Sequence, residues 1–172
     1  MPLRSVRALA AFGFCLTFPS LASAFENQWH LGAGAGVNTF TEEVEIGPAL
    51  NLHGAYGLSD SFDLRVELTG AWHALDDDES VTLAGALGGA TYKIDVIEWI
   101  PYFGLMVGYA GLLGDAAPEG SSWLYAAAPL GIDYAWTRQW GMGVQVRPGL
   151  LVGEETNGIF TALLRAEYRF GF

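Results

Sequence analysis

The sequence predicts an all-β protein, an eight-stranded antiparallel transmembrane β-barrel with an up-and-down meander, and three observations lead to this prediction. Hydrophobic residues make up 51% of the 172 residues and charged residues only 16%, below the roughly 25% of an ordinary soluble domain. No stretch after the first 24 residues stays apolar for the roughly 18 to 20 residues that a membrane helix needs. Apolar residues instead alternate with polar or small ones, which is the period of a strand with two different faces.

Residues 1–24 have the layout of a secretory signal peptide, and residues 25–172 are expected to form the barrel. Arg4 and Arg7 precede a largely apolar run, and Ala22-Ser23-Ala24 offers the small residues of a cleavage site. Cys15 lies in this leader, so the mature chain has no cysteine. Its six Lys and Arg against 19 Asp and Glu give a net charge of −13. That balance argues against nucleic acid, whose partners carry basic patches.

We predict cleavage after Ala24, because Ala22 and Ala24 supply the two small side chains that the peptidase requires. N-terminal sequencing of the mature protein should therefore begin at Phe25. A chain that starts before Ser20, or one that keeps the leader, would contradict this prediction.

Eight segments of the mature chain alternate in this way, and each is about long enough to cross a bilayer, which takes roughly 9 to 11 residues per strand. In the last and clearest one, Phe160, Leu164 and Tyr168 share one face while Thr161 and Arg165 share the other. An even strand number fits a bacterial barrel whose two ends lie on one side of the membrane. The predicted strands are 29–38, 46–58, 62–72, 81–94, 101–109, 124–134, 140–150 and 160–172.

The fourth segment is the least regular. Val81, Leu83 and Leu87 have one parity, whereas Tyr92 and Ile94 have the other. A β-bulge near Gly88-Gly89 would reconcile the two halves, because one extra residue switches the faces of a strand.

The connections differ at the two predicted ends of the barrel. Those after the first, third, fifth and seventh strands hold 11 of the 19 acidic residues, whereas those after the second, fourth and sixth are tighter. Short turns at one end and longer polar loops at the other are typical of outer-membrane barrels with periplasmic termini. Aromatic residues gather at the strand ends, more densely at the turn end, as in interfacial girdles. At the loop end the candidates are Phe40, Trp72, Trp123 and Phe160.

Eight charged residues share the parity predicted to face the lumen: Asp63, Arg65, Glu67, Asp133, Arg147, Arg165, Glu167 and Arg169. An eight-stranded barrel is just wide enough for side chains to fill it, and buried charges must pair. Four acids and four bases balance, so we predict an internal salt-bridge network in which Arg147, Arg165, Glu67 and Glu167 pair. A water or solute pathway along these groups is the alternative interpretation.

Nothing in the sequence predicts catalysis, a metal site or a cofactor, and the chain is expected not to be an enzyme. None of the three histidines, His30, His53 and His73, has a serine two residues further along the same strand face, so no nucleophile and base are paired there. The acidic loop Asp76-Asp77-Asp78-Glu79 lacks the ligand spacing of a calcium loop, and a solvated loop is the better interpretation.

The chain resembles the small outer-membrane β-barrel (porin-like) family, the eight-stranded relatives of the OmpA transmembrane domain, OmpX and OmpW. The residues that carry the resemblance are 56–64, 91–94, 101–104, 131–134 and 168–172. The closing alternation of Tyr168, Phe170 and Phe172 is similar to the signal that the barrel assembly machinery reads.

The resemblance implies a protein of the Gram-negative outer membrane with a structural or narrow porin-like role. The alternatives are a hydrophobic-solute channel and a lipid-modifying outer-membrane enzyme. The implied partners are outer-membrane lipids and, during insertion, the barrel assembly machinery. A monomer is expected.

Overall fold

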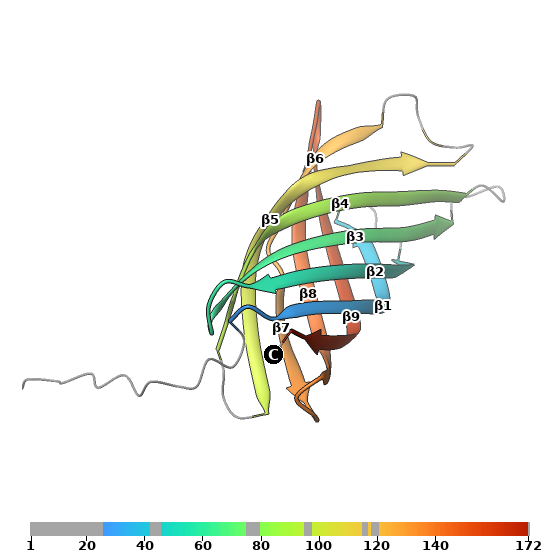
Figure 1. The fold of residues 1–172 in the computed structure, drawn as a ribbon. Helices are drawn as coiled ribbons and strands as arrows, with labels where there is room; N and C mark the ends of the chain where they lie inside the picture. Colours follow the sequence, from blue (N-terminus) through green and yellow to red (C-terminus); the bar gives the residue numbers. More distant parts are fainter. Residues whose placement is uncertain are drawn as a thin grey trace, which may run out of the picture.

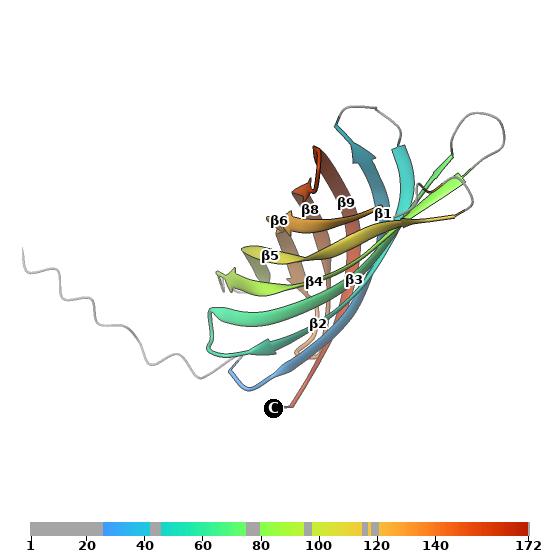
Figure 2. The same ribbon diagram turned by 90° about the horizontal axis from the view of Figure 1, so that it is seen from above.

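The computed structural model describes residues 26–41, 46–74, 80–94, 98–114, 117 and 121–171. They form one antiparallel sheet that closes on itself, because β9 pairs with β1 as well as with β8. Figures 1 and 2 show the strands as a ring of long, tilted ribbons. The strands are β1 (Trp29–Phe40), β2 (Ile46–Gly57), β3 (Phe62–Ala74), β4 (Ser80–Lys93), β5 (Trp99–Leu113), β6 (Ser122–Ala127), β7 (Leu130–Ala135), β8 (Trp140–Val152) and β9 (Thr156–Phe170).

The nine strands make eight spanning strands, as predicted, because β6 and β7 are two halves of one. Both halves pair with β5 and with β8 in an unbroken register. The break falls at Ala128-Pro129. Proline cannot donate to a ladder, yet the Gly104 amide still donates to the Pro129 carbonyl at 2.9 Å and the Ala128 amide to the Pro148 carbonyl at 3.0 Å.

The register fixes the stagger of the barrel. Following paired residues once around the ring leads from His30 to Phe40 on the same strand, and this offset tilts the strands relative to the barrel axis. The path runs through His30, Ala55, Arg65, Gly89, Met106, Ala127, Gly149, Ile159 and Phe40.

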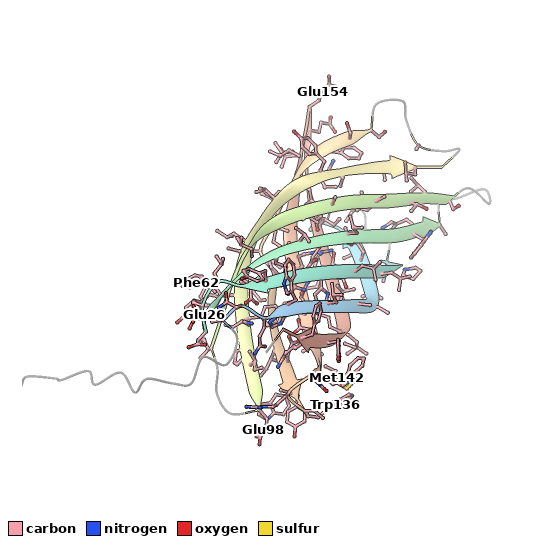
Figure 3. The ribbon with its side chains drawn as sticks, in the orientation of Figure 1. Glu26, Phe62, Glu98, Trp136, Met142 and Glu154 are labelled. Carbon is pink, nitrogen blue, oxygen red and sulfur yellow. The ribbon has the colours of Figure 1, made fainter. Side chains whose placement is uncertain are left out.

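Hydroxyl side chains close two of the tight turns at the turn end. The Ser59 hydroxyl accepts hydrogen bonds from the amides of Ser61 and Phe62 after β2. The Thr137 hydroxyl accepts from the amides of Gln139 and Trp140 before β8. Ser and Thr favour turns because their side chains satisfy local backbone donors in this way. In Figure 3, Glu98 and Trp136 mark this turn end, and Glu154 marks the opposite, loop end.

The outward face of the barrel is apolar. Leu105, Leu164 and Val66 are 60% exposed or more, and no charged residue shares their parity within the described strands. Aromatic rings pair across neighbouring strands at the turn end, with ring centroids 4.9 Å apart in Trp29–Tyr56, Phe62–Tyr92, Trp99–Tyr134 and Trp140–Tyr168. An apolar belt edged by aromatic residues is the exterior that a bilayer requires. No helix among the described residues is long and apolar enough to cross a membrane.

Two sequence expectations are wrong. β4 contains no bulge, since it pairs with β3 and β5 in continuous register, and Val81, Leu83 and Leu87 are buried inside the barrel. The loop-end girdle is also smaller than expected. Trp72 and Phe160 face outward, but Phe40 and Trp123 pack against the apolar cluster inside the lumen. Period-two alternation shows which residues share one face of a strand. It does not show which face points into the lumen when both faces carry apolar residues.

Candidate functional site in the barrel lumen

The lumen has two halves of different chemistry. Toward the loop end it is filled by a buried apolar cluster, which the sequence did not predict. Its members are Ala49, Ala71, Leu83, Leu87, Met106, Ala110, Tyr125, Ala127, Leu151, Ile159 and Leu163. Toward the turn end the inward positions carry ionised and hydrogen-bonding side chains, and the structure places all eight charged residues singled out from the sequence there, buried. This polar half is the candidate site.

Glu67 on β3 is the first hub of the network. Arg65 Nε lies 2.8 Å from its Oε1, the Arg147 guanidinium pairs with its Oε2, and Asn51 donates to the same oxygen at 3.3 Å. Arg147 comes from β8, on the other side of the bore, so this pair bridges the lumen. Arg147 is further held by Nη2, which donates to the Thr69 hydroxyl at 2.9 Å.

Glu167 on β9 is the second hub. Arg169 Nε donates to its Oε1 at 2.9 Å and Arg165 Nη2 donates to its Oε2 at 3.2 Å. His30 on β1 donates from Nδ1 to Oε1 at 3.0 Å. His53 on β2 has Nε2 3.4 Å from Oε2 and accepts a hydrogen bond from Arg165 at 2.8 Å. Side chains from β1 and β9 thus converge on one carboxylate, and His53 from β2 joins them through Arg165.

Tyr102 on β5 and Gln145 on β8 join the two hubs. The Tyr102 hydroxyl donates to Gln145 Oε1 at 2.9 Å and accepts from Arg165. Arg65 donates to the same Gln145 oxygen at 3.3 Å. The guanidinium carbons of Arg65 and Arg165 lie 5.7 Å and 4.9 Å from the centroid of the Tyr102 ring, within cation–π range. The network therefore spans the bore without a break.

Lys93 on β4 is a network member that the sequence analysis left out. Its ammonium lies 2.8 Å from Asp63 Oδ2, and both residues are buried. The signal was present in the alternation: Tyr92 and Ile94 on the outward side place Lys93, which lies between them, on the inward face. The predicted balance of four acids and four bases is therefore wrong: among the described residues the lumen holds five cations, Arg65, Lys93, Arg147, Arg165 and Arg169, against Asp63, Glu67, Asp133 and Glu167.

Glycines on neighbouring strands make room for these long side chains. A Cβ on Gly32 would collide with the His53 ring, and one on Gly131 with the Tyr102 ring.

The remaining predicted residues have longer contacts or lie on the outer face. Asp133 Oδ2 is 3.7 Å from Arg165 Nη1. Of the predicted assembly signal, Tyr168 and Phe170 face outward at the end of β9, and Phe172 lies outside the described residues.

The histidines all point into the barrel. His30 and His53 belong to the Glu167 hub, and His73 lies in the loop-end half, with Nε2 3.2 Å from Asn38 Oδ1. No group of three or more His, Cys, Asp or Glu side chains in the described ranges could hold a metal ion.

Comparison with known proteins finds similarity in fold alone, since no family model and no curated protein matches the sequence. Neisserial surface protein A aligns with a TM-score of 0.63 at 17% identity, over 84% of this chain and 96% of that one. OprG from Pseudomonas aeruginosa aligns with a TM-score of 0.63 at 12% identity, over 86% and 97%. The outer membrane enzyme PagL aligns with a TM-score of 0.56 at 13% identity, over 79% and 97%.

The closed ring, the apolar exterior and these neighbours together define the class: a transmembrane β-barrel of the Gram-negative outer-membrane type. Within that class the chain is a small outer membrane β-barrel protein with eight spanning strands. The signal peptide predicted at residues 1–24 lies outside the described residues. The neighbours include an enzyme as well as surface proteins, so the fold does not decide the activity.

Proposed function

We propose that this protein is a closed barrel with a structural role in the outer membrane, rather than an open pore. The observation that carries the proposal is the network across the lumen. Glu67 from β3 holds Arg147 from β8, and Glu167 from β9 holds His30 from β1. The side chains of these hubs are at most 8% exposed. An eight-stranded barrel is just wide enough for side chains to fill its interior, and side chains that join opposite walls obstruct the path of a solute.

A hydrophobic-solute channel is the second candidate, because the loop-end half of the lumen is apolar. Its side chains pack against one another, and Leu83, Met106 and Ile159 are no more than 2% exposed. A solute that entered this half would next reach the charged network toward the turn end. An apolar molecule makes no favourable contacts with that network. These two features favour the closed barrel over the channel.

A lipid-modifying enzyme would need polar catalytic groups that reach the lipid. The three histidines are instead buried in the lumen, and His30 and His53 are engaged by Glu167 and Arg165. We therefore propose a non-catalytic protein. Mass spectrometry of lipid A from cells with and without the protein tests this, and a change in acylation that depends on the protein would overturn it.

We further propose that the barrel is a monomer that contacts outer-membrane lipids and is inserted by the barrel assembly machinery. The outward positions of Tyr168 and Phe170 at the end of β9 support the last point, since they leave both rings accessible to an assembly factor.

The closed barrel predicts that Arg165→Ala increases conductance. Arg165 bridges Tyr102, Asp133 and Glu167, so its removal opens the middle of the network and admits water. In planar bilayers the wild type should show rare, small steps, and Arg165→Ala should show larger or more frequent ones.

Arg138→Ala is the matched control, because Arg138 is exposed in the turn between β7 and β8 and its loss leaves the lumen intact. Steady wild-type conductance that Arg165→Ala does not alter would refute the closed barrel and favour a narrow pore.

A further inference from the structure

His53 on β2 is held in one protonation state by its neighbour. Arg165 Nη2 lies 2.8 Å from His53 Nε2, and because a guanidinium carries only N–H donors, the histidine nitrogen must be the acceptor. His53 Nε2 therefore has no proton, and the ring is neutral. The His53 side chain has no exposed surface, so water does not compete for this nitrogen. The link that Arg165 makes from β9 to β2 lasts only while Nε2 stays unprotonated.

A carboxylate lies within reach of the same nitrogen. Glu167 Oε2 is 3.4 Å from His53 Nε2 and 3.2 Å from Arg165 Nη2. While Nε2 has no proton, Arg165 donates to this oxygen and His53 does not. A proton on Nε2 turns it into a charged donor, which binds a carboxylate strongly and repels the guanidinium 2.8 Å away. Proton uptake therefore exchanges the partner of His53 from Arg165 to Glu167.

The groups around the ring indicate that His53 is the residue that responds to a proton. The charged or titratable side chains that act on the ring or on its two partners are Arg65 and Glu67 from β3, Arg165, Glu167 and Arg169 from β9, His30 from β1, Tyr102 from β5 and Asp133 from β7. Arg65 is held in place, because its Nε is 2.8 Å from Glu67 Oε1. His30 already donates from Nδ1 to Glu167 at 3.0 Å, and a second proton on His30 keeps that bond. At His53, by contrast, a proton reverses the direction of a hydrogen bond.

The surroundings of the pair decide which of the two side chains moves. A Cβ on Gly32 would collide with the His53 ring, so the ring lies against the backbone of β1 and has no room to turn toward that strand. Arg165 has a second carboxylate to go to. Asp133 Oδ2 on β7 is 3.7 Å from Arg165 Nη1, and Asp133 Oδ1 has no hydrogen-bond donor among the described residues. A guanidinium that leaves His53 therefore moves toward β7 and away from β2.

We propose that His53 is a proton-operated gate in the lumen, which regulates the closed barrel proposed above and rests on that proposal. At neutral pH, Arg165 links β9 to β2 and obstructs the bore. In acid, a proton from the medium binds His53 Nε2, His53 pairs with Glu167, and Arg165 moves to Asp133. The link to β2 is then broken and water enters beside β1 and β2. One proton thus selects between two arrangements of the same side chains, as in other histidine switches.

Planar-bilayer recordings at about pH 7.5 and about pH 4.5, on either side of the range in which histidine usually titrates, test the gate. The wild type should show rare, small steps at the higher pH. At the lower pH its steps should become severalfold larger or more frequent, approaching those of Arg165→Ala. His53→Gln should keep the low conductance at both pH values, because its amide oxygen still accepts from Arg165 but takes up no proton.

His73→Gln is the matched control, since it removes another buried histidine. His73 lies in the loop-end half, with Nε2 3.2 Å from Asn38 Oδ1, so its loss leaves Arg165 in place and should keep the wild-type response to acid. A wild type that stays closed in acid, or a His53→Gln barrel that opens as the wild type does, would overturn the gate alone. Steady conductance at neutral pH that Arg165→Ala does not change would refute the closed barrel and the gate with it.

Nitrogen NMR of isotope-labelled histidine rings checks the chemistry without relying on conductance. In the folded wild type at neutral pH, His53 Nε2 should have the chemical shift of a nitrogen without a proton. If His53→Gln does not fold, the pH at which the His53 ring takes up its proton should coincide with the midpoint of opening in the wild type. A proton on Nε2 at neutral pH, or two different midpoints, would contradict the proposal.

Discussion

Glu67→Gln should lower the free energy of unfolding by about 3–5 kcal/mol, the cost of leaving buried charge without its partner. Glu67 pairs with both Arg65 and Arg147, so the neutral amide leaves two guanidiniums uncompensated in a site that is nearly closed to solvent. Water that enters the lumen of the variant would reduce the loss. Urea unfolding of the barrel in lipid vesicles measures it.

The control for this experiment is Glu155→Gln. Glu155 is an exposed acid in the turn between β8 and β9, so the change should alter stability by less than about 0.5 kcal/mol.

The double variant Glu67→Leu/Arg147→Met tests the mechanism further. Replacing a buried ion pair by apolar groups is often close to neutral, so this variant should recover much of the loss, apart from the share due to Arg65. A Glu67→Gln barrel as stable as the wild type would show that the network does not brace the lumen.

Leu164→Arg should cost about 2–4 kcal/mol, the penalty for Arg on the lipid face near the bilayer midplane. Leu164 is 69% exposed on the outer face of β9, about midway between the turn-end aromatic pairs and the loop end, so its replacement puts a guanidinium among acyl chains. The same unfolding measurement applies.

Phe170→Arg is the matched control, because Phe170 shares the outward face of β9 but lies at its turn end. There Arg reaches the interface and should cost only about 0–1 kcal/mol. Equal losses of stability for the two variants would mean that Leu164 does not lie deeper in the bilayer than Phe170, against the placement that the turn-end aromatic residues indicate.

Leu163 shows that the sequence predicts which residues face inward but not what surrounds them. Alternation correctly put Leu163 inside and Leu164 outside, since Leu163 is 3% exposed and Leu164 is 69% exposed. From alternation alone, an inward Arg at position 163 would be expected to be tolerated as Arg165 is. The structure places Leu163 in the apolar cluster instead, so Leu163→Arg should also destabilise the barrel, for lack of a carboxylate nearby.

The sequence by itself determined the faces of every spanning strand except β4, the number of spanning strands and the difference between the two ends. These features are local: side chains alternate with a period of two along every strand, and lipid tolerates only apolar groups on one face. The inward placement of Glu67, Arg147, Arg165 and Glu167 followed from parity alone.

The tertiary structure alone decided which inward side chains meet. Glu67 reaches Arg147 across the bore, and Lys93 reaches Asp63 on the neighbouring strand, because the ring closes with a stagger that sets the height of each strand against the others. The same stagger gathers the apolar inward residues toward the loops and the charges toward the turns. Parity cannot reveal this separation, because parity carries no information on height.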